Sequence, residues 1–300
     1  MEIKKLFVHR LPALVLCFFI LIFAFPVCAQ SEDTGWEIIQ YVDISGNVGL
    51  FYSLRNQQDG TVILIDSGNP GNADVVRQAI NDLGGHVDAW FLTHYHPDHI
   101  GAFNAVWDEV KDRIDQIYVT PMDYETYESI AHEWDDPQTF AAFLENTKGH
   151  ENITALYRGD EFEIDGLKIR IFNAYDEHVK ELSTDWCNDC SLVIKISAEE
   201  ESMLFLGDLS RKGVPLAEYI LDTFSIDAIK ADYVQGGHHG NWGLPISFYE
   251  KIPMKEFFFN APEWVMTGEQ YDAKDLVAWC KEQGIITHDY RDGDVSFILK

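Results

Sequence analysis

A dense run of potential metal ligands stands near the end of the first third of the chain. His94, His96, Asp98 and His99 fall within six residues, in the order Thr-His-Tyr-His-Pro-Asp-His. His94 and His96 are two residues apart, so in extended backbone their side chains leave on the same side and can share one metal ion. Pro97 ends the strand, and the turn after it brings Asp98 and His99 round to the same cavity. Imidazole nitrogens combined with carboxylate oxygens predict a zinc-type site.

The segments on both sides of this run have the patterns needed to hold it in place. Residues 87–92 are mostly apolar and predict a buried strand, and residues 100–110 have helical spacing. Earlier in the chain, residues 61–66 read as an apolar strand that ends at Asp66, and residues 74–83 have helical spacing after a Ser-Gly turn. The ligands therefore stand where a buried strand gives way to a helix.

The rest of the chain alternates strands and helices in two β-rich halves. We expect strands at residues 36–42, 49–55, 61–66, 87–92, 116–120, 155–157, 161–164, 167–172, 191–196, 203–206, 228–234, 256–260, 285–289 and 295–299. We expect helices at residues 74–83, 100–110, 216–224, 246–252 and 273–283, with a mostly helical insert at residues 123–148. Such halves predict an α/β fold, an αββα sandwich of two packed sheets with helices on both outer faces.

The insert carries five aromatic side chains whose role the sequence leaves open. They are Tyr124, Tyr127, Trp134, Phe140 and Phe143. In one interpretation they pack the insert onto the body of the domain. In the other, the insert is a lid over the metal pocket and some of these rings face a ligand.

The complete His-x-His-x-Asp-His run, followed by Ile100 and Gly101, resembles the signature of the metallo-β-lactamase-fold hydrolase superfamily. The resemblance implies a sandwich of the metallo-β-lactamase type that binds two metal ions, which we expect to be Zn²⁺, with Mn²⁺ or Fe²⁺ as alternatives. The side chains that it assigns to the metals are His94 and His96 for the first ion, Asp98 and His99 for the second, Asp208 as the bridge and His238 or His239 as the last ligand.

The same resemblance implies the roles of further residues. We take His238 as the metal ligand of the Gly-His-His-Gly segment, and Asp98 and His239 as the catalytic residues. Asp66, in Asp-Ser-Gly, would support the ligands without binding a metal itself. Two ions that share one hydroxide lower its pKa towards neutral and clamp the attacking and leaving oxygens.

One expected ligand of the first metal is missing. Most members of the superfamily carry a further histidine before the bridging aspartate, but residues 185–193 contain none. Asn188 or Asp189 could lie near the first metal, or water could take the place of the missing ligand. We expect Asn188 to support the ligands without binding the metal itself. His178, further upstream, is the alternative ligand.

The segments around the missing histidine indicate a particular branch of the superfamily. Asn188 before Ser-Leu-Val, the Leu-Gly-Asp strand and the strand that ends in His-His-Gly resemble one branch of the superfamily. That branch includes the hydrolase domain of bacterial DNA-uptake competence proteins and the secreted phosphorylcholine esterase of teichoic acid. It implies hydrolysis of a phosphodiester by a metal-bound hydroxide. The alternatives are a lactonase, β-lactamase or thioesterase using the same site, and a metal-binding module without turnover.

The N-terminal segment and the charge suggest where the protein works. Lys4, Lys5 and Arg10 precede an apolar run at residues 11–25 and a small-residue cleavage site at residues 27–29, which is typical of a signal peptide cut after Ala29. A retained membrane anchor is the alternative. We therefore expect a secreted or extracytoplasmic protein with one hydrolase domain at residues 30–300.

A net charge of −28 over 300 residues limits the partners. Such a surface repels nucleic acid and anionic lipid at long range, so we expect no stable nucleic-acid binding and no membrane contact after cleavage. Bound metal would make the pocket locally positive. The expected substrate is a small molecule or a wall or lipid head group.

Three cysteines lie beyond the expected signal peptide. Cys187 and Cys190 have a Cys-x-x-Cys spacing that allows either a local disulfide or two free thiols in an exported protein. A zinc ribbon would need a second such pair. Cys280 is expected to be a small buried side chain.

Overall fold

A computed structural model describes residues 35–300. The expected signal peptide at residues 1–29 lies outside the described residues. Among residues 35–300, no helix has the length and apolar character that crossing a membrane would need.

Fourteen strands of the described chain form two mixed seven-stranded sheets. The first sheet has the order β14-β1-β2-β3-β4-β5-β6, and the second has the order β13-β12-β11-β10-β9-β8-β7. The strands of the first sheet are β14 (Val295–Leu299), β1 (Trp36–Gln40), β2 (Phe51–Asn56), β3 (Val62–Asp66), β4 (Ala89–Leu92), β5 (Ile117–Val119) and β6 (Ile153–Ala155). Those of the second are β13 (Ile286–His288), β12 (Glu256–Phe258), β11 (Tyr233–Gln235), β10 (Ser202–Phe205), β9 (Val193–Ser197), β8 (Leu167–Asn173) and β7 (Glu161–Ile164).

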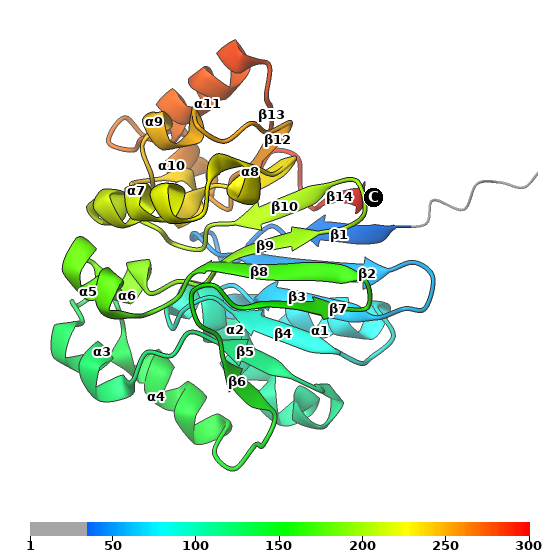
Figure 1. The fold of residues 1–300 in the computed structure, drawn as a ribbon. Coiled ribbons are helices and arrows are strands. Elements are labelled where there is room, and N and C mark those ends of the chain that lie inside the picture. Colours follow the sequence, from blue (N-terminus) through cyan, green and yellow to red (C-terminus); the bar gives the residue numbers. More distant parts are fainter. Residues whose placement is uncertain (1–34) are drawn as a thin grey trace, which may run out of the picture. The chain divides into compact units, whose positions relative to one another are not determined.

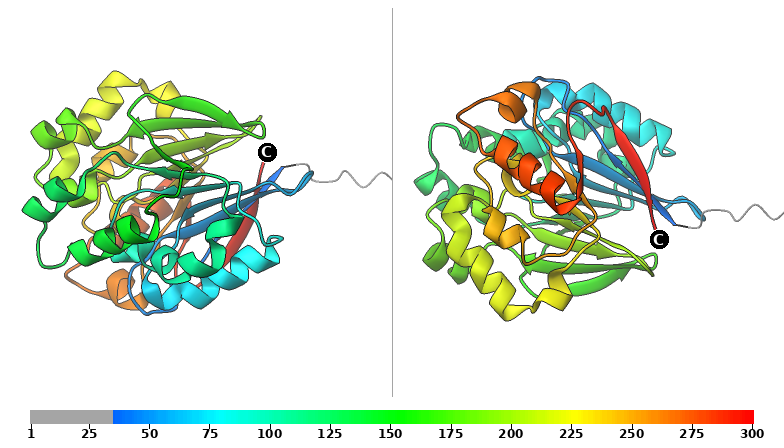
Figure 2. Two further views of the ribbon diagram at one scale, coloured as in Figure 1. Left: turned by 90° about the horizontal axis from the view of Figure 1, so that it is seen from below. Right: turned by 90° about the horizontal axis from the view of Figure 1, so that it is seen from above.

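Helices lie on the outer faces of the two sheets (Figure 1, Figure 2). Those that follow strands of the first sheet are α1 (Ala73–Asp82), α2 (Pro97–Val110), α3 (Tyr124–Ile130) and α4 (Pro137–Asn146). Those in the second half are α5 (Glu177–Leu182), α6 (Trp186–Asp189), α7 (Val214–Thr223), α8 (Ile226–Ile229), α9 (Ile246–Tyr249), α10 (Glu263–Thr267) and α11 (Ala273–Gln283). Short 3₁₀ turns occur at η1 (Pro70–Asn72), η2 (Lys111–Arg113), η3 (Arg211–Gly213) and η4 (Gly237–Gly240).

The core consists of layers because the central strands are buried on both faces. In β3, Val62 and Leu64 belong to the apolar cluster shared with the helices. Ile63 and Ile65 belong to the cluster between the sheets, which also contains Ile194 of β9. Each fully buried side chain of this size stabilises the fold by about 1.5–3 kcal/mol. The expected αββα sandwich is confirmed.

The topology directs several loops to one edge of the sandwich. In the first sheet β3 and β4 run parallel, and in the second sheet β10 and β11 run parallel. The carboxyl ends of parallel strands meet at one edge of a sheet, where ligand sites of α/β proteins usually form. All the predicted metal ligands follow the ends of these strands.

The structure corrects two expected elements and adds three short helices that were not expected. The expected strand at residues 228–234 is wrong in its first half, because α8 covers Ile226–Ile229 and β11 starts only at Tyr233. The helix after the metal run starts at Pro97 rather than at residue 100, because proline suits the first position of a helix. The short helices α5, α6 and α10 were not expected, since six residues or fewer carry too little periodicity.

The insert at residues 123–148 contains α3 and α4, and its aromatic rings divide between the two interpretations. Tyr127, Phe140 and Phe143 are buried in the core. Tyr95, in the metal run, stacks on Phe140 with ring centroids 3.6 Å apart. Trp134 is 64% exposed and lines the cavity described below. The insert is thus packed onto the domain and also contributes one ring to the cavity.

Candidate metal centre

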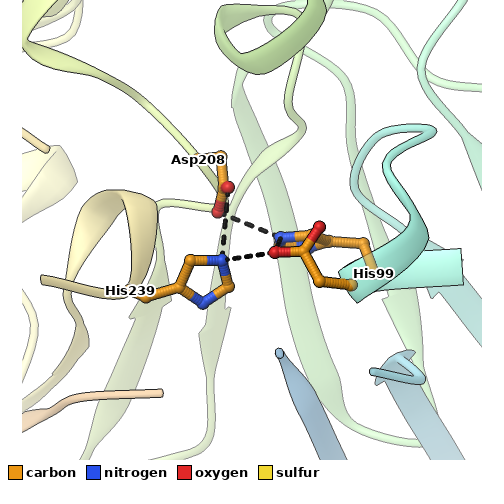
Figure 3. A group of neighbouring side chains, drawn as sticks. His99, Asp208 and His239 are labelled. Carbon is orange, nitrogen blue, oxygen red and sulfur yellow. Dashed lines mark hydrogen bonds and ion pairs between the residues drawn. The ribbon is translucent and has the colours of Figure 1, made fainter. Parts of the chain in front are cut away.

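Histidine and aspartate side chains from both sheets meet at this edge in two groups. One group contains Asp98, His99, Asp208 and His239, and the other contains His94, His96 and Asp208. Within each group the potential ligand atoms lie within 4.8 Å of one another. Asp208 belongs to both groups, and Figure 3 shows its carboxylate between the rings of His99 and His239. The structure therefore brings together every predicted ligand except His238.

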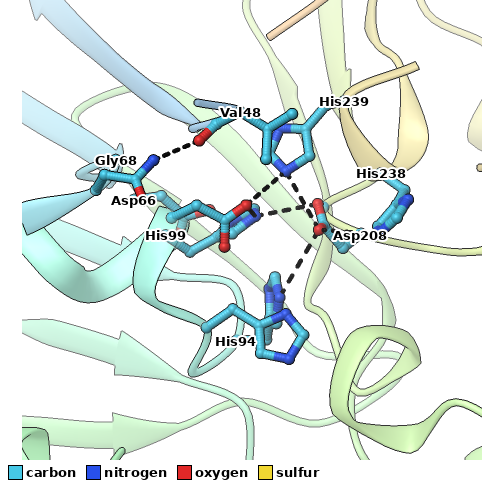
Figure 4. Close-up of polar contacts among 12 residues, drawn as sticks. Val48, Asp66, Gly68, His94, His99, Asp208, His238 and His239 are labelled. Atoms are coloured by element: carbon cyan, nitrogen blue, oxygen red, sulfur yellow. Dashed lines mark hydrogen bonds and ion pairs between the residues drawn. The ribbon is translucent and has the colours of Figure 1, made fainter. Parts of the chain in front are cut away.

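Asp66 orients the ring of His99. Its carboxylate accepts hydrogen bonds from the Thr93 backbone N–H and the Thr93 hydroxyl, both at 2.7 Å. Its Oδ2 also lies 2.7 Å from His99 Nδ1. With Nδ1 engaged in this way, His99 Nε2 faces the cluster and lies 3.1 Å from Asp208 Oδ1 (Figure 4). Asp66 has a left-handed backbone with φ of 53°, a conformation that aspartate tolerates better than most residues.

Ser191 links His94 to Asp208. Its hydroxyl oxygen lies 3.2 Å from His94 Nδ1 and accepts a hydrogen bond from the Asp208 backbone N–H at 3.0 Å. His94 Nε2 is left to face the cluster. A side chain at Gly207 would place its Cβ 2.7 Å from Ser191 Cβ, so glycine allows this close approach. This role of Ser191 was not predicted from the sequence, in which Ser191 is only part of a motif.

Asp135, from the insert, contacts His96 and was also missed. Asp135 Oδ1 lies 3.1 Å from His96 Nε2, and Asp135 Oδ2 accepts a hydrogen bond from the His132 backbone N–H. Burial would raise the pKa of the Asp135 carboxyl, but the bond with His96 holds it below its usual range. With Nε2 bound to Asp135, Nδ1 of His96 is the nitrogen left free to bind a cation. The sequence carried no signal for this contact, because 39 residues separate the two side chains.

Several buried polar atoms of the cluster lack a hydrogen-bond partner. His94 Nε2, His99 Nε2 and Asp208 Oδ1 are among them. His99 Nε2 and Asp208 Oδ1 are only 3.1 Å apart without a hydrogen-bond geometry, as expected of two atoms directed at a common third point. Unpaired buried polar atoms are rare and costly in proteins. The donor set is that of zinc, iron or manganese, so these residues fit two divalent cations.

The charges in the cluster also favour a cation. Burial and the nearby rings of His99 and His96 lower the pKa of His94 well below its usual value, so His94 is a neutral imidazole. Burial would lower the pKa of His99, but the carboxylates of Asp208, Asp66 and Asp98 raise it well above the usual value.

The pKa values of Asp98 and His239 also depend on the charges around them. Burial would raise the pKa of Asp98, but the charges of His99 and His239 lower it to about 2. Burial would lower the pKa of His239, and Asp208 and Asp98 raise it to about 9. These buried carboxylates therefore require positive charge beside them, which a divalent cation supplies in place of protons.

Of the two histidines of the Gly-His-His-Gly segment, His239 and not His238 belongs to a metal group. His239 Nε2 lies 3.0 Å from Asp98 Oδ2 and 3.4 Å from Asp208 Oδ2, in the cluster. His238 Nε2 is 3.9 Å from Asp208 Oδ2, and its Nδ1 bonds to the Asn241 carbonyl. The physical reason is the backbone, since both residues are left-handed, with φ of 50° and 61°. The structure thus places His239 where we expected His238.

The residues considered for the missing ligand lie in different places. The buried Asn188 Oδ1 has no hydrogen-bond partner, and Asn188 lines the same cavity as the cluster. Asp189 instead accepts a hydrogen bond from the Ser210 backbone N–H at 2.7 Å and so supports the loop after Asp208. His178 stacks on Tyr219 of α7 and pairs with Asp176, away from both groups. Of the described cysteines, Cys187, Cys190 and Cys280 are all buried free thiols.

A cavity of about 770 Å³ opens over the metal cluster. Its polar floor includes His96, Asp98, Asp208 and both histidines of the Gly-His-His-Gly segment. Its walls include the cationic side chains Arg211 and Lys212 and the aromatic side chains Trp134, Trp242, Trp264 and Tyr271. This volume suits a small-molecule ligand.

Comparison with known proteins places the chain in a family. The family model described as the metallo-beta-lactamase superfamily matches residues 44–252. A curated relative, "RNase aCSPSF2" of Saccharolobus solfataricus, is 25% identical over 213 residues, which is 65% of this chain and 38% of the relative. The chain thus spans about two fifths of the length of that relative.

Solved structures share the fold at low sequence identity. The metallo-beta-lactamase fold protein YhfI of Bacillus subtilis is 13% identical, with a TM-score of 0.51 over 84% of this chain and 95% of that one. The metallo hydrolase Igni18 of Ignicoccus hospitalis is 13% identical, with a TM-score of 0.52 over 88% of this chain and 100% of that one. CmlA, a diiron beta-hydroxylase from Streptomyces venezuelae, is 14% identical, with a TM-score of 0.57 over 88% of this chain and 54% of that one. With a family model that covers more than half of its length and a His/Asp metal site at the expected edge of the fold, the chain belongs to the metallo-beta-lactamase superfamily.

Proposed function

We propose that this protein is a dinuclear metal-dependent hydrolase of small phosphodiesters. The observation that carries the proposal is the pair of buried His/Asp groups that share Asp208. His94, His96 and Asp208 would hold one cation, and Asp98, His99, His239 and Asp208 the other. Cations bound there supply Lewis acidity towards phosphoryl oxygens and lower the pKa of water.

His238 is the residue best placed to act on the substrate. Its Nδ1 faces the Asn241 carbonyl, which can only accept, so Nδ1 carries a hydrogen. In the neutral ring, Nε2 then has a free lone pair. His238 lines the cavity and its side chain is 23% exposed, so Nε2 is open to a ligand. The Nε2 lone pair can accept the proton that the attacking water loses, and we assign to His238 Nε2 the transfer of that proton to the leaving oxygen. The catalytic histidine that we expected from the sequence was His239.

Three observations favour a phosphodiester over a neutral lactam. The first metal group has two histidines and one shared carboxylate, so a cation held there would have coordination positions open to hard anionic oxygens. Arg211 and Lys212 line the same cavity in a chain with a net charge of −28. The curated relative is named an RNase, and RNases cleave phosphodiester bonds. We also propose that the chain belongs to the branch of the superfamily that includes the competence-protein hydrolase domain and the phosphorylcholine esterase.

The proposal predicts an order of substrates. On one metal-loaded preparation, bis-p-nitrophenyl phosphate or p-nitrophenyl phosphorylcholine should be hydrolysed faster than nitrocefin, because an anionic phosphodiester suits the open metal positions and the cationic wall. Release of p-nitrophenol and the colour change of nitrocefin measure the rates directly. Faster turnover of nitrocefin than of both phosphodiesters would reject phosphodiester hydrolysis in favour of lactam opening.

A further inference from the structure

Three aromatic rings form a contiguous group in the lining of the cavity. The aromatic wall consists of Trp242, Trp264 and Tyr271, all of which line the cavity that contains the metal cluster. The ring centroids of Trp242 and Tyr271 are 5.8 Å apart, and those of Trp264 and Tyr271 are 5.4 Å apart. Trp242 is 39% exposed and Trp264 is 46% exposed. Single exposed aromatics are common, but a contiguous exposed group beside a polar site indicates ligand binding.

Hydrogen bonds hold two of these rings in place, and the backbone of one of them is strained. Trp242 has a left-handed backbone with φ of 52°, which is unusual for a bulky residue. Its carbonyl accepts a hydrogen bond from the Arg211 backbone N–H at 2.9 Å, and the neighbouring Gly243 forms a β-bridge with Ser210. Trp264 Nε1 donates to the Gly46 carbonyl at 2.9 Å. Strained backbone of this kind concentrates at ligand sites, so an ordered strained tryptophan points to a binding role.

The charges around the wall select the kind of group that it can bind. The Arg211 guanidinium lies 5.1 Å from the centroid of the Trp242 ring, so a cation already occupies one face of that ring. A second cation, such as a quaternary ammonium, would be repelled there. A neutral planar ring would instead stack on the remaining aromatic surface, and Arg211 itself can stack on such a ring.

The cavity also offers positive charge to an anion. Arg211 and Lys212 are consecutive and both line it. Arg211 Nη1 is 3.8 Å from Asp272, and Lys212 Nζ is 3.3 Å from Asp185, so each also has a carboxylate neighbour. Both side chains are about half exposed, which leaves them accessible to a ligand. The ligand that matches this wall joins a neutral planar ring to a phosphate.

We propose that the aromatic wall is a stacking subsite for the base of a nucleotide whose phosphate ester is the substrate, a proposal that rests on the function proposed above. The net charge of −28 disfavours a long polyanion, so a mononucleotide ester or short nucleotide fits better than a nucleic-acid chain. Stacking of a base on an aromatic ring increases affinity roughly tenfold, and this gain is tolerant of base identity.

Binding to the Mn²⁺-loaded protein tests the subsite without relying on turnover. Calorimetric titration should show that adenosine 5′-monophosphate binds about tenfold tighter than ribose 5-phosphate, which has the same phosphate and no base. Trp242→Ala and Trp264→Ala should each reduce this ratio several-fold while the affinity for ribose 5-phosphate is kept. Trp264→Phe should retain most of the ratio, because a ring remains. Tyr157→Ala, at an exposed aromatic outside the cavity, is the matched control and should leave the ratio unchanged.

Three results would overturn the subsite. They are equal affinities for the two phosphates, a ratio that survives both tryptophan-to-alanine substitutions, and tighter binding of choline phosphate than of the nucleotide, which would indicate a subsite for a cation. Hydrolysis of bis-p-nitrophenyl phosphate by the same preparation separates the two proposals. If it is hydrolysed but the ratio is one, only the subsite fails. If the ratio is about ten but no phosphodiester is hydrolysed, the proposed function fails and the subsite stands.

Discussion

Replacing Asp208 with asparagine should lower kcat for bis-p-nitrophenyl phosphate about a thousandfold or more. Asp208 is the single side chain shared by the two His/Asp groups, and it is 1% exposed. Asparagine keeps its volume but removes the negative charge that both cations would share. Loss of a central electrostatic group costs about 3–4 kcal/mol of transition-state stabilisation, which corresponds to a factor of about 10²–10³, and weaker metal binding adds to this loss.

The matched control for this variant is Asp227→Asn. Asp227 makes an exposed ion pair with Lys230 and belongs to neither His/Asp group. Its variant should retain the activity of the unchanged protein in the same initial-rate assay. An Asp208→Asn protein that melts normally and keeps more than a tenth of the activity would show that Asp208 does not bridge the site.

The second large effect is expected at Asp66, which contacts a proposed metal ligand but belongs to neither His/Asp group. Asp66 Oδ1 accepts from the Thr93 backbone N–H, and Oδ2 contacts both His99 Nδ1 and the Thr93 hydroxyl. In Asp66→Asn the amide oxygen must keep the Oδ1 position, because an NH₂ cannot accept from a backbone N–H, so the NH₂ replaces Oδ2. His99 then loses the acceptor that fixes its tautomer, so Nε2 is no longer reliably free for a metal. Loss of such an outer partner typically weakens metal binding 10–100-fold. Competition with a chromophoric chelator should show this weakening for one of the two metal equivalents.

Asp165→Asn is a close control for the Asp66 variant. Asp165 also has a left-handed backbone, with φ of 46°, in the turn between β7 and β8. The same substitution in a similar conformation should leave both metal affinities unchanged. Equal metal binding by Asp66→Asn and the unchanged protein would refute the orienting role of Asp66.

The metal run and most of the strands could be predicted because their signals are local. His94, His96, Asp98 and His99 lie in one short segment, and a buried strand followed by a helix positions all four. The strand patterns came from apolar runs bounded by turn residues, and these runs are buried on both sides in the sandwich. Even so, the first turn of α2 was misjudged, because Pro97 reads equally as a strand breaker and as a helix start.

The roles of His238 and His239 could not be settled from sequence. Two adjacent histidines offer the same chemistry, and the choice depends on left-handed φ values at both positions. The packing of the segment determines these values. Its neighbour Gly240 also has positive φ, and its Cβ would lie 2.3 Å from the ring of Phe259. Neither propensity nor spacing contains that information.

Contacts between distant segments were missed for a related reason. Asp135 and Ser191 contact ligands that lie 39 and 97 residues away in the sequence. The aromatic wall consists of Trp242, which follows η4, Trp264 of α10 and Tyr271 after α10. The sequence did not predict α10, because a helix of five residues shows too little periodicity. Such contacts depend on how the two sheets pack, which the order of elements alone does not specify.

The central claim is that the two His/Asp groups hold two divalent cations, and the metal content of the purified protein tests it most directly. Elemental analysis should find about two equivalents of zinc, manganese or iron per chain, as expected of a dinuclear site. The double variant His96→Ala with Asp98→Ala removes one ligand from each group and should bind clearly less metal while it remains folded. A protein that takes up no metal when supplied with these ions, or a double variant with unchanged metal content, would contradict the account.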